Sequence, residues 1–290
     1  MEKENLLVEG ITLELAKYRK QQVSDVLYHL DFKVPKEKNQ PIPANLKLEL
    51  TINDLENDLL LDFNEESSKL KLLKVNGKVS EIHHKKEHLI IDVSDLKMGK
   101  NNIKISFEAG ESSLNRNEEF LYTLLVPDRA STLFPCFDQP DIKAKYKLSI
   151  TAPKDWEVMC GGFEESFELK KDFVEHIYEE TDKMSTYLFS FVAGKFVEKH
   201  KNPGSFLMSF LYRETDEEKI TESLDTIFDI HQKSIDFLEE YTAKKFPFKK
   251  MDFVTIPPFQ YGGMEHVGAI QYRESSLFLV NIREQNLIES

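Results

Sequence analysis

The sequence contains very little cysteine, with only Cys136 and Cys160 among its 290 residues. Two thiols cannot build a disulfide framework, and their spacing is not that of a Cys-x-x-Cys motif. We therefore expect both to be small buried side chains. The sequence also has no apolar run near the ~18 residues that a membrane-spanning helix requires, so we expect no membrane span.

Basic residues are outnumbered by acidic ones, 38 against 51, which gives a net charge of −13. A chain of this charge repels nucleic acid and anionic membranes, so we expect neither as a partner. The first ten residues carry acidic charge and no apolar run, and no signal peptide is expected there. This fits a soluble cytoplasmic protein, and it also fits an exported protein whose signal has been removed, so the location stays unknown.

Alternation of apolar and polar residues is the main pattern present in the first two thirds of the chain. Four stretches alternate in this way: residues 46–52, 103–107, 146–150 and 187–191. Turn residues separate such runs at 76–77, 98–101, 109–110 and 161–162. The pattern predicts a mainly β fold, with a large antiparallel domain over residues 1–200. Before its strands, residues 11–25 are weakly helical, with Leu13, Ala16 and Lys20 on one side.

The pattern changes after residue 200. Residues 201–204 (KNPG) are typical of a linker, and a strand follows at 206–212. Thr215 and Glu218 have the spacing of a capping box, which predicts a helix from this point. Its apolar residues recur at helical spacing: Ile220, Leu224, Ile227, Phe228, Ile235, Leu238 and Tyr241. A strand at 251–256 comes next, so residues 201–290 are predicted to be the start of an incomplete α+β domain.

The segment from Phe259 to Phe278 carries the most informative chemistry. Gly262 and Gly263 place no Cβ in the way of a neighbouring backbone, and Glu265 follows them among apolar residues. We expect this strand to be largely buried, with the carboxylate paired or aimed into a cleft. One interpretation is an extended-peptide site in which Glu265 receives an amine. The other is a simple Gly-Gly turn with the acid bonded to a local arginine.

Three motifs resemble those of the M1 family of zinc aminopeptidases, gluzincins that include leukotriene A4 hydrolase. Gly262-Gly263-Met264-Glu265-His266 is similar to the family's G-x-M-E-N exopeptidase motif. Residues 133–141 (LFPCFDQPD) and 185–191 (STYLFSF) are similar to two signatures of its amino-terminal domain. The resemblance implies a β-saddle amino-terminal domain followed by the first part of a thermolysin-like catalytic domain.

The resemblance also implies roles for individual residues. Glu265 would hold the free α-amino group of a peptide substrate, while Gly262, Gly263 and Met264 would offer backbone contacts. His266 replaces the usual Asn, which leaves the neighbouring polar contact open. Val126 stands where the family has a second acid, and Asp128 is a substitute candidate; Asp128 equally suits a turn cap or a pairing near Arg129.

The family's zinc ligands are missing from the sequence. M1 enzymes hold zinc with H-E-x-x-H on a helix and a further Glu, and none of the eight histidines opens that motif. We therefore expect no metal ligand and no catalytic residue in this chain, zinc only in the full-length enzyme, and no activity from the chain alone. The alternative is a non-catalytic peptide-binding or adaptor protein that retains the β-saddle. If the α+β part is incomplete, we expect it to expose apolar surface and to self-associate, whereas a stable, monodisperse chain would favour the alternative.

One other histidine pattern needs an interpretation. His84-Lys85-Lys86-Glu87-His88 spells H-x-x-E-H, an inverted zinc-protease motif that requires a helix. Its surroundings alternate as strands do, so a solvated turn in a hairpin is predicted instead. His231 lies on the apolar stripe of the predicted helix, and we interpret it as a core or boundary histidine.

Overall fold

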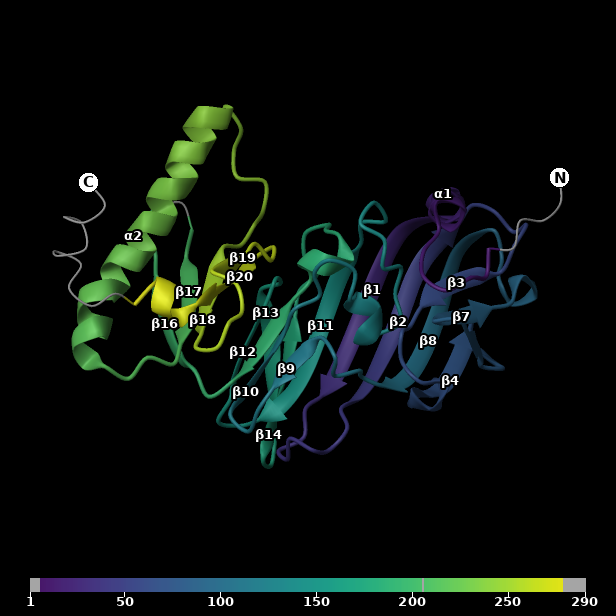
Figure 1. Cartoon of the computed structure of the whole chain (residues 1–290), viewed down its shortest axis with the longest axis horizontal. Helices are drawn as coiled ribbons and strands as arrows, with labels where there is room; N and C mark the ends of the chain where they lie inside the picture. The colour runs from purple at the N-terminus through teal and green to yellow at the C-terminus, as the bar shows by residue number, and fades with distance from the viewer. Residues whose placement is uncertain (1–5, 205, 279–290) are drawn as a thin grey trace. The chain divides into compact units, whose positions relative to one another are not determined.

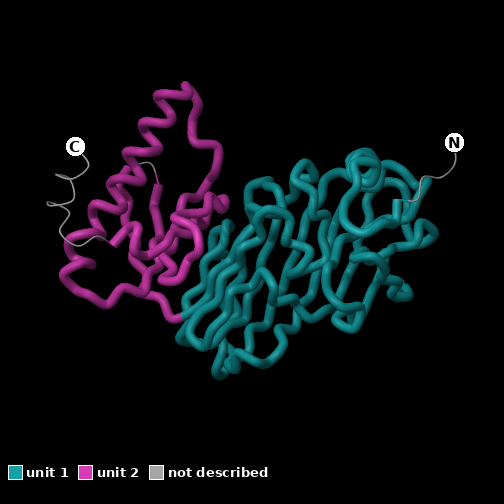
Figure 2. The backbone as a smooth tube through the Cα atoms, in the orientation of Figure 1, with its two compact units in different colours: residues 1–194 teal, residues 195–290 magenta. Residues whose placement is uncertain are grey.

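The computed structural model describes residues 6–204 and 206–278, and the chain divides into two compact units. Residues 1–194 form unit 1 and residues 195–290 form unit 2 (Figure 2). The observed architecture is mainly β, as the sequence predicts, with two α-helices among the described residues. No helix in those two ranges is both long enough and apolar enough to cross a membrane.

Unit 1 is built on an eight-stranded sheet (Figure 1). Its strands run in the order β13 (Glu164–Lys170), β14 (Phe173–Tyr178), β11 (Lys145–Pro153), β1 (Val23–Lys33), β2 (Pro43–Ile52), β8 (Gly99–Glu108), β4 (Leu70–Val75) and β5 (Lys78–Ser80). Neighbours are antiparallel except for β1 and β11, which pair in parallel and so depart from the purely antiparallel expectation. In β2 every second residue is buried, which is the alternation that the sequence predicts for a sheet with one face on the core.

Two smaller sheets, one helix and four short 3₁₀ turns complete unit 1. The four-stranded sheet runs β12 (Glu157–Cys160), β15 (Phe191–Gly194), β10 (Phe120–Thr123) and β9 (Leu114–Arg116). The three-stranded sheet runs β3 (Leu59–Asp62), β7 (His88–Ile91) and β6 (His83–Lys85). Helix α1 spans Leu13–Gln22, and the 3₁₀ turns are η1 (Ser67–Lys69), η2 (Val93–Asp95), η3 (Ala130–Thr132) and η4 (Thr186–Leu188).

The core of unit 1 contains the two signature segments of the amino-terminal domain. Tyr146 stacks on Phe189 with ring centroids 4.5 Å apart and on Tyr28 at 5.2 Å. The hydroxyl of Tyr28 accepts a hydrogen bond from the backbone N of Phe137 at 2.9 Å. Cys136 and Cys160 are both buried free thiols, as expected. Most of the residues in these two segments therefore belong to the core of unit 1, and the end of the first segment, residues 138–141, lines a cavity.

Unit 2 contains a mixed five-stranded sheet with one long helix. The strand order is β16 (Val197–Lys201), β17 (Met208–Tyr212), β18 (Asp252–Ile256), β20 (Ala269–Arg273) and β19 (Gly263–Met264), and a 3₁₀ turn η5 covers Glu274–Ser276. Helix α2 (Glu217–Thr242) connects the parallel strands β17 and β18. Ile227, Phe228 and Ile235 from α2 pack with Phe210 and Phe253 of the sheet in one buried cluster.

Three local expectations are wrong in detail. Helix α1 buries Leu15, Arg19 and Gln22, while Leu13 is 63% exposed, because Arg19 forms a buried ion pair beneath the helix. The 187–191 strand begins only at Phe191, since Thr186–Leu188 form a 3₁₀ turn that directs Phe189 into the core. Residues 201–204 are not a linker between units; they connect β16 to β17 within unit 2.

The ends of α2 also differ from the prediction. Asp216, not Thr215, caps the helix, and its carboxylate accepts hydrogen bonds from the backbone N of Glu218 and Lys219 at 3.0 and 3.3 Å. Asp216 takes this place because the Glu214 side chain occupies the backbone N–H groups of residues 215 and 216. At the other end, Leu238 and Tyr241 follow the helical spacing but are exposed, because the sheet cluster ends at Ile235.

Candidate peptide-binding site

The glycine-rich segment forms an edge of the unit 2 sheet. Strand β19 pairs with β20 in antiparallel register, Gly263 opposite Tyr272 and Met264 opposite Gln271. Among the strands of the described residues, β19 has no neighbour on its outer side. An open strand edge offers backbone N–H and C=O groups that an extended peptide can pair with.

The two glycines differ in what surrounds them. A Cβ at Gly263 would lie 3.0 Å from Cδ1 of Tyr272, so a side chain there would displace the tyrosine ring. A Cβ at Gly262 would meet no atom within 4 Å. The ring of Tyr272 packs so close to the backbone at Gly263 that a larger residue would displace it. Gly262 instead faces open space beside the strand edge.

Glu265 lies directly after β19 and is exposed. Its carboxylate makes no hydrogen bond and no ion pair with any residue in the described part of the chain. Glu265 is therefore not buried as expected, because the chain leaves the sheet at Met264 before Glu265 is reached, and of the two alternatives for its carboxylate the paired one is wrong. The local-arginine interpretation fails as well: Arg273 donates from Nε to the Phe259 carbonyl and from Nη2 to the Gln260 carbonyl, at 2.9 and 2.8 Å.

Met264 and His266, the two neighbours of Glu265, are buried. The backbone N of His266 donates to the Met264 carbonyl at 2.9 Å, and the His266 carbonyl accepts from the backbone N of Ala269 at 3.2 Å. Gly268 closes this turn with φ +75°, a conformation that favours glycine. Of the three side chains from Met264 to His266, only that of Glu265 is presented to solvent.

Arg273 and Tyr272 support the site, and the sequence alone did not identify these roles. The two hydrogen bonds of Arg273 fix the loop that leads into Gly262, and the Arg273 backbone N donates to the Gly262 carbonyl at 3.0 Å. Tyr272 lies under Gly263, and its hydroxyl is 3.1 Å from Nε2 of His231. Tyr272 and Arg273 are the last two residues of β20, and neighbouring side chains of a strand point to opposite faces. This alternation is the signal from which two different supporting roles could have been predicted.

His231 connects this support to α2. Its ring stacks on Phe253 with centroids 4.1 Å apart, and Nδ1 is 2.8 Å from the Ile227 carbonyl. Burial lowers the pKa of His231, so the neutral ring is favoured. One neutral tautomer makes both hydrogen bonds: its Nδ1–H donates to the Ile227 carbonyl, and its Nε2 accepts from the hydroxyl of Tyr272. His231 is thus a core histidine, as expected from its place on the helix.

Asp128 belongs to unit 1, whereas Gly262–His266 belong to unit 2. It is exposed in the turn between β10 and η3, at a cavity of about 550 Å³ that Asp62, Glu87, Asp138 and Asp141 also line. The side chain of Arg129 is not its partner, since Arg129 Nη2 donates to the Ser112 carbonyl at 2.7 Å. Asp128 therefore presents a carboxylate to a polar, acidic cavity.

The H-x-x-E-H spelling lies on a β-hairpin, as predicted. His84 is in β6 and His88 in β7, with Lys86 and Glu87 in the turn at positive φ. Only part of the segment is solvated: His88 is buried, with Nδ1 2.8 Å from the Asp62 carboxylate and Nε2 2.8 Å from the Val8 carbonyl. Nε2 of His84 lies 2.8 Å from the Phe63 carbonyl. Both imidazoles therefore have structural partners.

The described residues do not fit a zinc ion. Within residues 6–204 and 206–278, no group of three or more His, Cys, Asp or Glu side chains is arranged to hold a metal. Structural and catalytic zinc sites need at least three such ligands from the protein. No reaction step is therefore assigned to a metal in this chain.

Comparisons with known proteins support the resemblance to M1 aminopeptidases. Residues 24–188 match the model of the peptidase M1 N-terminal domain, and residues 226–289 match that of the peptidase family M1 domain. Endoplasmic reticulum aminopeptidase 1 of Mus musculus is 32% identical over 61% of this chain and 19% of its own length. Glutamyl aminopeptidase of Homo sapiens is 36% identical over 52% of this chain and 16% of its length.

A bacterial aminopeptidase is similar to the same extent. Aminopeptidase N of Streptomyces lividans is 30% identical over 56% of this chain and 19% of its own length. The chain thus aligns with less than a fifth of the length of these relatives. The N-terminal domain model covers more than half of the chain, residues 24–188 of 290, and the M1 domain model follows it in the expected order. The chain belongs to peptidase family M1.

Proposed function

We propose that this chain is the amino-terminal, substrate-recognising portion of a zinc aminopeptidase that removes amino-terminal residues from peptides. The observation that carries the proposal is the exposed carboxylate of Glu265, which lies directly after an open strand edge. All three relatives named above are aminopeptidases.

The geometry suits an extended peptide whose amino end stops at Glu265. The outer edge of β19, at Gly263 and Met264, would pair with the first peptide unit of the substrate. Gly262 leaves open space beside that edge, so a substrate backbone can approach closely. The carboxylate of Glu265 would then accept charge-assisted hydrogen bonds from the substrate ammonium group.

This arrangement would select free amino termini. The carboxylate of Glu265 can accept hydrogen bonds from the ammonium group of a free amino terminus. An acylated amino terminus or an internal peptide unit carries no positive charge there, so it would bind more weakly. The requirement also fixes which peptide bond is positioned for cleavage. His266 is buried, so we assign it to the shape of the turn, and Asp128 stays a candidate second acid for the amine.

Cleavage itself is assigned to other parts of the longer protein. The relatives are several times longer than the segments that match this chain, and M1 aminopeptidases depend on zinc. We propose that the 290-residue chain lacks activity by itself, because its described residues supply recognition but no group of side chains arranged to hold a metal. Turnover of an aminoacyl anilide by the isolated chain, dependent on added zinc, would contradict this part of the proposal.

The role of Glu265 is tested in the full-length enzyme with Glu265→Gln. The variant keeps the shape but loses the charge, and we expect KM for aminoacyl anilides to rise by about tenfold to a hundredfold, since a hydrogen bond to a charged group contributes ~1.5–3 kcal/mol. Discrimination between a free and an N-acetylated peptide should fall as well. Steady-state kinetics on both substrates measure these effects.

Glu222→Gln is the matched control. Glu222 is exposed on α2, away from β19, and its replacement makes the same charge change. We expect its kinetics to equal those of the unaltered enzyme. Unchanged KM and unchanged amino-terminal selectivity in Glu265→Gln would overturn the role given to this residue.

A further inference from the structure

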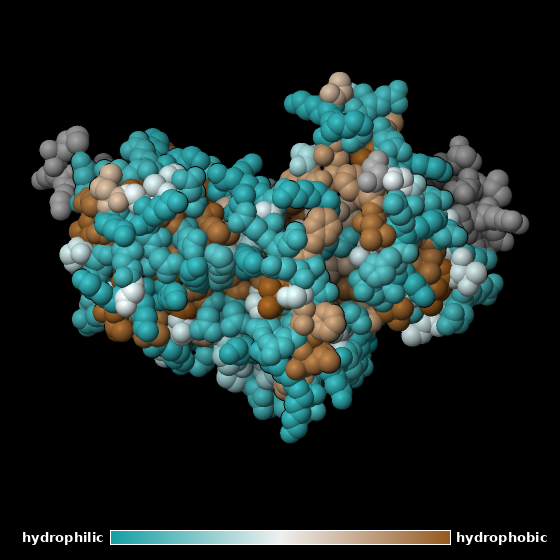
Figure 3. Space-filling model, turned by 180° about the vertical axis from the view of Figure 1, so that it is seen from behind, coloured by the Kyte–Doolittle hydropathy of each residue, from teal (hydrophilic) through white to brown (hydrophobic). Residues whose placement is uncertain are grey.

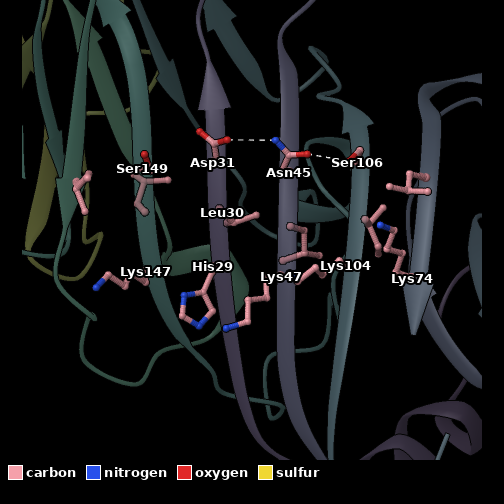
Figure 4. A pocket seen from close by; sticks show the side chains of 15 residues that line it. His29, Leu30, Asp31, Asn45, Lys47, Lys74, Lys104, Ser106, Lys147 and Ser149 are labelled. Carbon is pink, nitrogen blue, oxygen red and sulfur yellow. Dashed lines mark hydrogen bonds between the residues drawn. The ribbon is translucent and has the colours of Figure 1, made fainter. Parts of the chain in front are cut away.

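The open face of the eight-stranded sheet carries a row of basic side chains that the proposed function does not use. His29 on β1 lies opposite Lys147 on β11 and opposite Lys47 on β2. Lys47 lies opposite Lys104 on β8, which in turn lies opposite Lys74 on β4. Five basic residues from five adjacent strands therefore line up across the sheet (Figure 4). We call Lys147, His29, Lys47, Lys104 and Lys74 the basic row.

The basic row lines a groove of about 430 Å³. Adjacent strands are ~4.8 Å apart, so five strands give the row a length of about 19 Å. Like charges placed directly opposite one another in a sheet are destabilising. The row therefore concentrates positive charge in a chain whose net charge is −13, at a cost that a bound anion would relieve.

Carboxylates balance only one end of the row. Lys147 pairs with Glu165 at 2.9 Å, and Lys47 contacts Glu49, which also lies 3.7 Å from Nε2 of His29. Lys74 and Lys104 make no ion pair with any described residue. Burial, and then the charge of Lys47, lower the pKa of His29, so its ring is neutral near pH 7. The unbalanced positive charge thus lies over β8 and β4.

A second row, made mainly of polar side chains, runs parallel to the basic row. On each strand its residue is two positions away from the residue of the basic row, on the same face of the sheet. Ser106 Oγ donates to Asn45 Oδ1 at 2.8 Å, and Asn45 Nδ2 donates to Asp31 Oδ2 at 3.1 Å (Figure 4). The other oxygen of Asp31, Oδ1, is buried from solvent and has no hydrogen-bond partner among the described residues. Leu72 and Ile177, both half-buried, stand at the two ends of this polar row.

We propose that this groove is a docking surface for an extended acidic peptide segment of another protein. Such a segment matches the groove in charge, since its carboxylates can accept hydrogen bonds from the ammonium groups of Lys74 and Lys104. About six residues of extended chain cover the length of the row. Leu72 and Ile177 add apolar contacts for the side chains between the acids.

Other anions fit less well. A single phosphate group is much shorter than the row of about 19 Å, so it could contact only part of the basic side chains. A nucleic acid or an anionic membrane extends far beyond the groove and meets the field of a chain with 13 excess negative charges. A short peptide avoids most of that repulsion, because charges more than ~10 Å away are screened at 0.1 M salt.

The test is binding of a fluorescein-labelled, N-acetylated peptide with Glu at alternate positions (EAEAEAE) to the 290-residue chain, measured by anisotropy at low salt. Acetylation removes the amine, so Glu265 has no role and the result is independent of the proposed function. We expect saturable binding that weakens with added salt. The neutral QAQAQAQ and basic KAKAKAK peptides should not bind.

Paired variants locate the surface. Lys74→Gln with Lys104→Gln should weaken EAEAEAE binding by about tenfold, since each exposed ion pair contributes less than a tenfold change. Lys17→Gln with Lys154→Gln makes the same charge change at two exposed lysines outside the row and should alter binding less than twofold. Circular dichroism confirms that both paired variants are folded.

Three results would overturn the proposal. They are no saturable binding of EAEAEAE at low salt, an equal loss of binding in the control pair, and tighter binding of tripolyphosphate or of phosphatidylserine vesicles with the same dependence on Lys74 and Lys104. The last result would make the groove an anion or membrane site instead of a peptide surface.

Discussion

At the residue scale, a buried ion pair joins Arg19 of α1 to Asp62 of β3. The guanidinium of Arg19 donates two hydrogen bonds to the carboxylate of Asp62, at 2.8 and 2.6 Å, and the Arg19 side chain is 0% exposed. The backbone N of Asp138 donates to the same carboxylate at 2.9 Å. Burial alone would raise the pKa of Asp62, but Arg19 and the hydrogen bonds lower it below its ordinary value.

Arg19→Met tests this pair. The change leaves a buried carboxylate without its cation, and we expect the free energy of unfolding to fall by about 3–5 kcal/mol. Because the pKa of Asp62 is lowered in the folded protein, its contribution is present above the unfolded pKa of ~3.9 and is lost as pH falls through the lower folded value. In the variant the carboxylate keeps only His88 and the backbone N of Asp138 as partners and favours its protonated form more than in the unaltered chain, so the deficit should shrink as pH falls from 7 toward 4.

Urea denaturation at pH 7 and at pH 4.5 measures both effects. Lys17→Met is the matched control, because Lys17 is exposed on the same helix and should change stability by less than ~0.5 kcal/mol. A deficit in Arg19→Met that equals the control, or that does not vary with pH, would mean that the pair contributes little.

At the element scale, α2 positions the candidate site through its packing against β18 and β20. His231 on the helix contacts both Phe253 and Tyr272, and Tyr272 lies beneath Gly263. Asp216 is the N-cap of the helix, and its carboxylate accepts hydrogen bonds from the backbone N–H groups of Glu218 and Lys219. The start of α2 therefore depends on a residue that the Thr-x-x-Glu spacing did not identify.

Two alanine variants distinguish the possible caps. Asp216→Ala should lower the free energy of unfolding by about 1 kcal/mol, the usual effect of removing an N-cap. Thr215→Ala should change it by less than ~0.5 kcal/mol, because the Thr215 side chain makes no capping bond. Denaturation monitored by far-ultraviolet circular dichroism measures both free energies of unfolding. A larger decrease in Thr215→Ala than in Asp216→Ala would mean that Thr215 is the cap, as the Thr-x-x-Glu spacing predicted.

At the scale of the whole molecule, apolar side chains remain on the surface of unit 2. Figure 3 shows hydrophobic residues scattered among hydrophilic ones on the face in view. Phe237 and Tyr241, in the last turns of α2, are 64% and 79% exposed and stack on each other with centroids 6.0 Å apart. Exposed apolar groups of this kind favour association between molecules.

Self-association of the 290-residue chain is therefore expected. Light scattering at tens of micromolar should give a mass above that of a monomer, and Phe237→Lys with Tyr241→Lys should shift it toward the monomer. Thr221→Lys with Ser234→Lys adds the same two charges at exposed polar positions of α2 and should leave association in place. A monomeric chain that binds no hydrophobic dye would contradict the expectation.

The fold was largely predictable because its signals are local. Alternation identified β2, β8 and β11, and helical spacing identified α2, since each reports which side of an element is buried. The hairpin at His84 followed from the same reasoning. Errors occurred where a contact distant in sequence decided the outcome, as with Arg19 and Asp62, or with Phe189 against Tyr146.

The candidate site divides in the same way. The sequence by itself determined the family motifs, the glycines and Glu265, because these are neighbours along the chain. Only the tertiary structure decided that Glu265 is exposed, that Arg273 holds the loop before Gly262, and that Asp128 lies in the other unit. The basic row is the clearest case, since residues between 29 and 147 become neighbours only through hydrogen bonding between strands, whose register no local pattern specifies.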